Sequence, residues 1–172
     1  MKMSTRTGGI AGIVAGLAYL VRAVIEFIQP QLYVNFVGLS DYANVTVFAI
    51  ALVATIVGLI GFHSFAQNRY GRGGAVGFWL TVIGASLLAS RVIASLYSGK
   101  WVLDIAGTGG VLLLLIGYLT VGMMAIRGKV LPVWGGLAFG LGFPLALFLS
   151  TYDSGILLGL GWLGVAYFLL KQ

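Results

Sequence analysis

The stretch ANVTVFAIALVATIVGLIGFHSFA, residues 43–66, decides the fold, because it contains no Asp, Glu, Lys or Arg over its whole length. A helix needs about 20 predominantly apolar residues to cross the hydrocarbon core of a bilayer. In the whole chain, 60% of the 172 residues are hydrophobic and 8% are charged, whereas soluble domains carry about 25% charged residues. A chain this short cannot bury so much apolar surface in a water-soluble core, so we predict an integral membrane protein.

Five further apolar segments of similar character flank this stretch, and connections rich in glycine, proline and charge separate them. Such residues mark turns and loops. The sequence therefore predicts an all-α, polytopic membrane bundle of six transmembrane helices, which forms a single domain over residues 1–172. The predicted helices span residues 8–29, 43–66, 75–98, 102–126, 131–151 and 155–170.

The distribution of charged residues provides an independent test of this division into six helices. Six crossings place seven basic residues on one side of the membrane and a single base, Lys100, on the other, together with Asp41, Asp104 and Asp153. Because basic loops stay in the cytoplasm, we predict a bacterial cytoplasmic membrane protein with both termini inside. The net charge of +6 then indicates contact with anionic lipid headgroups rather than with nucleic acid. The seven bases are Lys2, Arg6, Arg69, Arg72, Arg127, Lys129 and Lys171.

Paired glycines open the first, third and fifth predicted helices, a pattern that three tandem helical hairpins would produce. Glycine is common in membrane helices in general, so chance similarity also fits the pattern. Small residues four apart lie on one helix face and let two backbones approach closely. We therefore expect tight helix packing at seven glycines, namely Gly8, Gly12, Gly16, Gly73, Gly77, Gly136 and Gly140.

The stretch AYLVRAVIEF, residues 18–27, places Arg22 and Glu26 on one face of the first helix. Arg91 lies at a similar depth in the third helix, and Asp104 lies at the start of the fourth. A charge that faces lipid costs a few kcal/mol or more, so we expect these four side chains to converge in one polar cluster in the outer half of the membrane. Such a cluster serves either as a network that ties three helices together or as a pocket for a carboxylate, phosphate or lipid headgroup.

The sequence has few features typical of catalytic or metal-binding sites. It has no cysteine, its one histidine, His63, lies toward the opposite membrane face from the acids, and no hydrolase or nucleotide-binding motif appears. We therefore predict no enzyme activity, no cofactor and no metal. An intramembrane enzyme that uses Glu26 or His63 is the third and weakest of the functional hypotheses.

Two features leave structural and functional interpretations open. Pro144 interrupts the fifth helix in FGLGFPLALF, residues 139–148, where a proline makes either a fixed kink or the hinge of a discontinuous transporter helix. The outer connection PQLYVNFVGLSDY, residues 30–42, carries several aromatic residues. It is either an interfacial segment anchored by these rings or a lid over an outward-facing cavity.

The chain resembles a family of uncharacterised bacterial membrane proteins with six helices, known only as a domain of unknown function. The resemblance rests on ASRVIASL, residues 89–96, on LLLLIGYLTVGMMAIRGKVLPVWGGLAFGLGFPLALF, residues 112–148, and on the closing GWLGVAYFLLK, residues 161–171. It implies a six-helix fold and makes Arg91 a family feature, and it implies no activity.

The sequence thus favours a non-enzymatic membrane protein that binds its ligand through the outer-half cluster. The alternative is a small transporter or channel, which Pro144 and the repeat would suit. The expected partners are the lipid bilayer, an anionic lipid or small amphipathic ligand, and a partner membrane protein or further copies of the chain.

Overall fold

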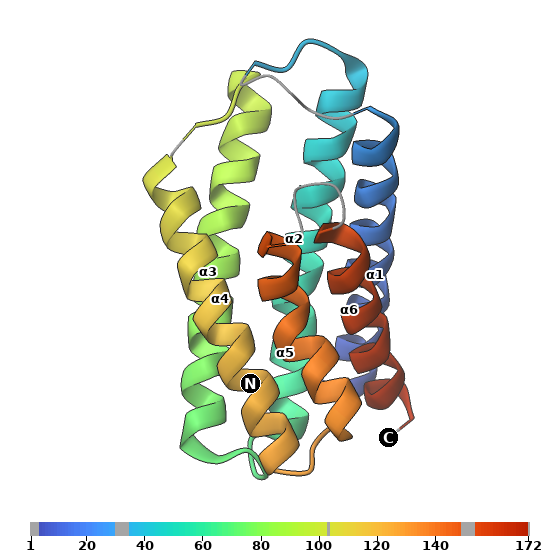
Figure 1. The fold of residues 1–172 in the computed structure, drawn as a ribbon, viewed down its shortest axis with the longest axis vertical. Coiled ribbons are helices and arrows are strands. Elements are labelled where there is room, and N and C mark those ends of the chain that lie inside the picture. The colour runs from blue at the N-terminus through green and yellow to red at the C-terminus, as the bar shows by residue number, and fades with distance from the viewer. Residues whose placement is uncertain (1–3, 30–34, 103, 149–153, 172) are drawn as a thin grey trace.

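The computed structural model describes residues 4–29, 35–102, 104–148 and 154–171 and contains six helices (Figure 1). Within these ranges the β-type pairing is a single isolated bridge between Asn35 and Lys100. The prediction of an all-α fold with six helices is therefore confirmed. The helices are α1 (Thr5–Ile28), α2 (Leu39–Ala66), α3 (Gly71–Ser98), α4 (Asp104–Arg127), α5 (Val133–Phe148) and α6 (Ser154–Leu170).

The helices fall into two length classes. Four of them, α1 to α4, are long and apolar enough to cross a membrane. The other two, α5 and α6, have only 16 and 17 residues, which corresponds to about 24–26 Å of helix against a hydrocarbon core of about 30 Å. The predicted fifth helix extended to residue 151, but α5 ends at Phe148, and residues 149–151 lie outside the described ranges.

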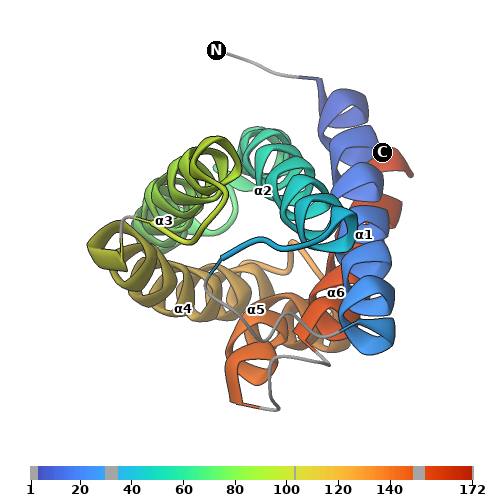
Figure 2. The same cartoon turned by 90° about the horizontal axis from the view of Figure 1, so that it is seen from above.

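Each helix packs on its neighbours in the sequence, and α6 packs back on α1, so the six helices form a closed ring (Figure 2). The long pairs α1–α2 and α3–α4 flank a short hairpin formed by α5 and α6. In Figure 1 this hairpin rises from the lower end of the molecule and stops well below the upper ends of α1, α2 and α3. Among the described residues, α5 and α6 therefore contribute only to the lower part of the ring.

Charge distinguishes the two ends of the ring. The start of α1, the α2–α3 and α4–α5 connections and the end of α6 share one end, which we call the basic end. Lys100 and Asp41 lie at the opposite end, which we call the far end; Lys2 and Asp153 lie outside the described residues. The described bases at the basic end are Arg6, Arg69, Arg72, Arg127, Lys129 and Lys171.

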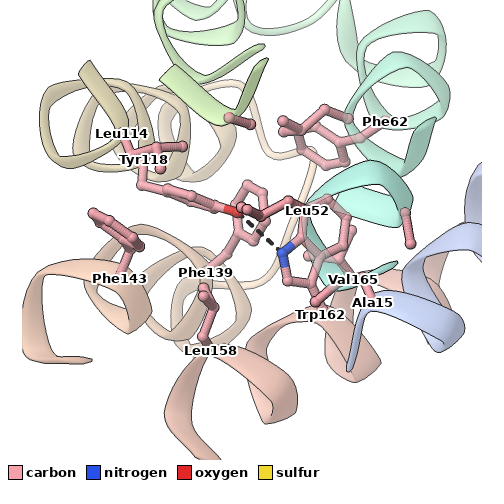
Figure 3. Packing of buried hydrophobic residues seen from close by; sticks show 14 of the residues in the cluster. Ala15, Leu52, Phe62, Leu114, Tyr118, Phe139, Phe143, Leu158, Trp162 and Val165 are labelled. Atoms are coloured by element: carbon pink, nitrogen blue, oxygen red, sulfur yellow. Dashed lines mark hydrogen bonds between the residues drawn. The ribbon is translucent and has the colours of Figure 1, made fainter. Parts of the chain in front are cut away.

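Aromatic side chains fill the centre of the ring around Trp162, which is fully buried. Its indole Nε1 donates a hydrogen bond of 3.0 Å to the Tyr118 hydroxyl, as Figure 3 shows. Phe139 packs edge-on against Trp162, with ring centroids 5.3 Å apart, and also contacts Phe62 and Tyr118. Trp162 thus lies at the centre of an aromatic cluster inside the bundle.

Glycines allow several helix backbones to touch. A Cβ added to Gly8 of α1 would lie 2.6 Å from the Cα of Gly61 in α2, and one added to Gly122 of α4 would lie 2.5 Å from the Cα of Gly140 in α5. Real Cβ atoms do not approach other atoms so closely, so these sites leave no room for a side chain. Gly16 meets the carbonyl oxygen of Gly159 in α6 in the same way.

The other four predicted packing glycines lie against neighbouring side chains or backbone as well. Gly12 faces Ala166 of α6, and Gly77 faces Thr120 and Val121 of α4. Gly73 and Gly136 lie under the side chains of Met124 and Ile126, respectively.

Candidate functional site

A cavity of about 330 Å³ lies inside the ring of helices, at the level where α5 ends and α6 begins. All six helices contribute to its lining, and so does Trp101 in the α3–α4 connection. Arg22 and Arg91 are the charged side chains among the described lining residues, and most of the rest are apolar. The lining consists of Tyr19, Arg22, Phe48, Leu52, Leu88, Arg91, Trp101, Val111, Phe143, Ala146, Leu147, Gly155 and Leu158.

The end of the α5–α6 hairpin forms one side of this cavity. Gly155, in the first turn of α6, packs against the Tyr19 carbonyl oxygen and Ala23 of α1. From Ala23, α1 continues to Ile28, which is about 7.5 Å further at 1.5 Å per residue. The described residues of α5 and α6 therefore end about one and a half helical turns below the end of α1.

Arg22 is held in the cavity wall by two neighbours, Glu26 and Phe48. Its Nε and Nη2 atoms donate to the same carboxylate oxygen, Oε1 of Glu26, at 3.1 and 2.5 Å. Its guanidinium carbon lies 3.7 Å from the centroid of the Phe48 ring, a cation–π contact. Asn44 Nδ2 donates to the same Glu26 oxygen at 3.3 Å. This network joins α1 to α2.

Two acceptor atoms of the network have no hydrogen-bond partner among the described residues, namely Oε2 of Glu26 and Oδ1 of Asn44. Both residues are buried, with Glu26 only 8% exposed. A buried acceptor without a donor costs about 1–3 kcal/mol. A hydrogen-bond donor from water or from a ligand would therefore be favourable beside these two oxygen atoms.

Arg91 reaches the cavity from α3. Its Nε atom donates to the carbonyl oxygen of Val102 at 3.1 Å, and its guanidinium carbon lies 5.1 Å from the centroid of the Trp101 ring. The side chain passes over Gly107 of α4, where an added Cβ would lie 2.6 Å from Arg91 Cδ. A glycine at this position lets the arginine lie across α4 and reach the cavity.

The four residues of the predicted polar cluster have different outcomes. Arg22 and Arg91 line one cavity, and Glu26 lies beside it, bonded to Arg22 and Asn44. Asp104 begins α4 at the same end of the ring, but its side chain lies outside the described part of the structure. Ligand binding by these groups stays a prediction.

The outer connection covers the far end of the cavity in its described part. The backbone N–H of Phe36 donates to the Gly99 carbonyl oxygen at 2.8 Å, next to the bridge between Asn35 and Lys100. The Phe36 ring is 9% exposed and meets the Trp101 ring edge-on at 5.6 Å. This connection thus crosses the ring and packs onto a residue of the cavity wall (Figure 2). Residues 30–34 of the predicted lid or interfacial segment lie outside the described residues.

His63 lies away from this site. Its Nδ1 atom makes a hydrogen bond with the Tyr70 hydroxyl, and its ring stacks on Phe78 with centroids 4.1 Å apart. His63 and Asn44, the partner of Glu26, are separated by about 28 Å along α2, so the two candidates for intramembrane catalysis are not brought together. Among the described residues, no three His, Asp or Glu side chains form a group that could hold a metal.

Pro144 lies inside α5, and the helix continues past it to Phe148. The residues on either side of it are close to the cavity, since Phe143 and Ala146 contribute to the lining. The proline is therefore part of the hairpin tip that forms one wall of the site.

Sequence reasoning missed the aromatic partners of the arginines. Phe48 is one of many apolar residues in α2, and nothing in its surroundings along the chain marks it as the partner of Arg22. Trp101 lies in the connection after the third helix, and its sequence context does not mark it as part of the cavity wall either.

No protein-family model, characterised protein or solved structure matches this chain. The functional proposal therefore depends on the chemistry of the cavity, and the family resemblance stays a prediction.

Proposed function

We propose that this chain is a non-enzymatic integral membrane protein that binds a small amphipathic anion in the far-end cavity. One observation carries the proposal: two arginine side chains from different helices, Arg22 and Arg91, line a single cavity whose other walls are mainly apolar. An anionic group would be received by the guanidinium groups, and the apolar part of the ligand would contact the aliphatic and aromatic walls.

Arginine suits this role because its guanidinium group carries five N–H donors in one plane and stays charged even when buried. Arg22 uses Nε and Nη2 for Glu26, so further donors of the same group can bind a carboxylate or phosphate. The face of the guanidinium contacts the Phe48 ring, which fixes its plane without using any of these donors. Leu52, Leu88 and Leu158 supply apolar surface nearby.

The proposed membrane arrangement has the basic end in the cytoplasm and the far end outside. The six described bases at the basic end, against Lys100 at the far end, support this orientation. In the full form of the proposal all six helices cross a cytoplasmic membrane, with α5 and α6 as short, closely packed spans. Both termini are then cytoplasmic.

The alternative of a transporter or channel has weaker support. Between the cavity and the basic end, the ring is filled by Trp162, Tyr118, Phe139 and Phe62. A flux assay in liposomes with small anions tests this alternative, and flux above that of empty vesicles would favour transport over binding.

Native mass spectrometry of the protein in detergent, with octanoate as the probe, tests the binding proposal. We expect an octanoate adduct in the unmodified chain and at least a tenfold loss of it in the variant Arg22→Gln/Glu26→Gln/Arg91→Gln, in which Glu26 is also neutral so that no buried carboxylate is left without its cation. Arg69→Gln is the matched control, because Arg69 also stacks on an aromatic ring, Phe65, but lies at the basic end. Equal adducts in all three proteins, or no adduct in any of them, would refute the proposal.

A further inference from the structure

We infer that Glu26 is a proton-binding site coupled to the cavity: when an anion binds to Arg22, the Glu26 carboxylate takes up one proton. This inference rests on the proposed function and deepens it, because it names the second species that binds together with the anion. The site then receives one negative and one positive charge, and its net charge stays the same.

The hydrogen bonding between Glu26 and Asn44 is one proton short of a complete pair. Asn44 Nδ2 donates to Glu26 Oε1 at 3.3 Å. The remaining oxygen of each group, Glu26 Oε2 and Asn44 Oδ1, has no hydrogen-bond partner among the described residues. A protonated carboxyl group is both a donor and an acceptor, so it can form two hydrogen bonds with a primary amide. A proton on Oε2 would therefore supply the donor that these two oxygens need.

Burial makes a proton a suitable donor at this point. Glu26 is 8% exposed and Asn44 is 3% exposed, so both oxygens lie away from bulk solvent. An unsatisfied acceptor in such surroundings is unfavourable. Water or a ligand group needs space beside the two oxygens, whereas a proton adds almost no volume. Protonation of Glu26 therefore supplies a donor without placing an atom larger than hydrogen between α1 and α2.

Arg22 connects this proton site to the cavity that it lines. Its Nε and Nη2 atoms both donate to Oε1 of Glu26, which leaves Oε2 as the oxygen for the proton. As long as Glu26 is ionised, its negative charge neutralises Arg22 and disfavours a second anion beside it. Once Glu26 is protonated, the positive charge of Arg22 attracts the ligand.

The other charged groups on the elements around Glu26 do not replace it in this exchange. Arg91 of α3 is the second cation of the cavity and favours an anion in either state of Glu26. The Asp41 carboxylate accepts from two backbone N–H groups at the start of α2. Helix α6, which packs on α1, contains no Asp, Glu, Lys, Arg or His, and the side chain of Asp104 lies outside the described residues. The further titratable groups of these elements toward the far end are Tyr19, Tyr42, Tyr97 and Lys100.

The exchange keeps every buried charge paired. Without a ligand, Arg22 is paired with the Glu26 carboxylate; with a ligand, it is paired with the anion, and Glu26 is neutral. A proton from the solution binds to Oε2, and no charge is left buried alone, which would be costly. Because such coupling is reciprocal, proton and anion each strengthen the binding of the other. With one proton per anion, Kd should rise about tenfold per pH unit where the proton is taken up.

Calorimetric titration with octanesulfonate tests the proton site directly. A sulfonate stays ionised near neutral pH, so this probe cannot carry the proton itself. The protein is titrated in detergent at about pH 7.5 in two buffers that differ in their enthalpy of ionisation, and the difference in binding heat gives the protons taken up. For the unmodified chain we expect about one proton per bound octanesulfonate.

Glu26→Gln tests which residue takes up the proton. The amide resembles the protonated acid, because its N–H can donate to Asn44 Oδ1 while its oxygen still accepts from Arg22. We expect this variant to bind octanesulfonate without proton uptake and, at about pH 8, at least fivefold more tightly than the unmodified chain. A merely structural role of Glu26 would instead weaken binding. Asp41→Asn is the matched control, because Asp41 is a carboxylate of the same end that does not line the cavity, and it should keep the proton uptake.

The outcomes separate this inference from the proposed function. If octanesulfonate binds to the unmodified chain without proton uptake, the proton site is wrong and anion binding stands; this measurement decides even where Glu26→Gln fails to fold. Proton uptake that persists in Glu26→Gln, or binding of octanoate but not of octanesulfonate, would also overturn it. If neither probe binds, the proposed function itself fails.

Discussion

The guanidinium group of Arg22 lies 3.7 Å from the centroid of the Phe48 ring, across the interface between α1 and α2. Arg91 has a similar relationship with Trp101, at 5.1 Å. In each case an aromatic ring supports the face of an arginine that lines the cavity. Such stacking orients a long, flexible side chain and leaves its N–H groups, which point outward in the guanidinium plane, able to make hydrogen bonds.

Loss of Arg22 alone should cost more stability than loss of Arg22 and Glu26 together. Arg22→Gln leaves the Glu26 carboxylate buried without its cation, so we expect a loss of about 3–5 kcal/mol in the free energy of unfolding. The double variant Arg22→Gln/Glu26→Gln should recover most of it, because the buried charge is gone. Equilibrium unfolding in detergent micelles measures both values. If the two variants are equally unstable, the ion pair is not the source of the effect.

Helix contact at Gly122 should tolerate no side chain. Gly122→Ala would place a methyl group against the backbone of Gly140, and we expect a loss of about 1–3 kcal/mol. Gly164→Ala in α6 is the control, because its Cβ would meet nothing within 4 Å. That substitution should be neutral or stabilising by up to about 1 kcal/mol, since alanine favours helices. Thermal unfolding of the two variants side by side decides the point, and equal melting temperatures would contradict it.

Removal of the Tyr118 hydroxyl should destabilise the centre of the ring. In Tyr118→Phe the indole N–H of Trp162 loses its acceptor inside a fully buried cluster. A buried donor without a partner costs about 1–3 kcal/mol, and chemical unfolding should show a loss of that size. Tyr167→Phe, at an exposed position of α6, should have no effect. A Tyr118→Phe protein as stable as the unmodified chain would mean that the indole N–H finds another acceptor.

Alkaline pH should weaken the protein partly through Tyr70. Burial raises the pKa of the Tyr70 hydroxyl above its ordinary value of about 10. A raised pKa in the folded state means that its stabilising contribution is complete below about pH 10 and is lost as the pH rises through the higher value. Tyr70→Phe should therefore be less stable than the unmodified chain at pH 8, because it lacks the bond to His63. Its stability should also decline less steeply above pH 10, and parallel pH profiles of unfolding would exclude this role for Tyr70.

Topology can be measured directly because the chain contains no cysteine. Single cysteines in Lys100→Cys and Lys129→Cys should react with a membrane-impermeant maleimide from opposite sides of the membrane. We expect Lys100→Cys to react in intact cells and Lys129→Cys to react only after the membrane is opened. Reaction of both from the same side would overturn the proposed orientation.

The number of helices and most of their boundaries could be predicted, because the glycine, proline and charged residues that end an apolar helix can be recognised in the sequence itself. The turn after Ser98 is an example: Gly99 ends α3 with φ +65°, a conformation that glycine adopts easily. The similar depth of Arg22 and Arg91 also follows from helix rise alone. Their placement in one cavity does not, since it depends on how far α5 and α6 extend and on which helices are neighbours in the ring.

The prediction extended the fifth helix to residue 151, because no glycine, proline or charged residue follows Phe148 before Asp153. The structure describes α5 to Phe148, and the last three residues of that prediction lie outside the described ranges. The stacking of Arg22 on Phe48 could not be predicted from the sequence. It pairs residues of two helices, and the rotation of these helices about their axes is set by packing at sites such as Gly8 and Gly61.

The short hairpin gives the molecule two heights around its circumference. In the proposed membrane arrangement, lipids beside α2 or α3 would meet helices of 28 residues, about 42 Å long, whereas those beside α5 and α6 would meet about 24–26 Å of described helix. A bilayer adapts to such hydrophobic mismatch by thinning locally, at a cost of fractions of a kcal/mol per Å. The outer leaflet should therefore dip along this one flank of the protein. That depression lowers lipid headgroups toward the level of Arg22 and Arg91, and it makes the flank the side on which two copies would share a common deformation.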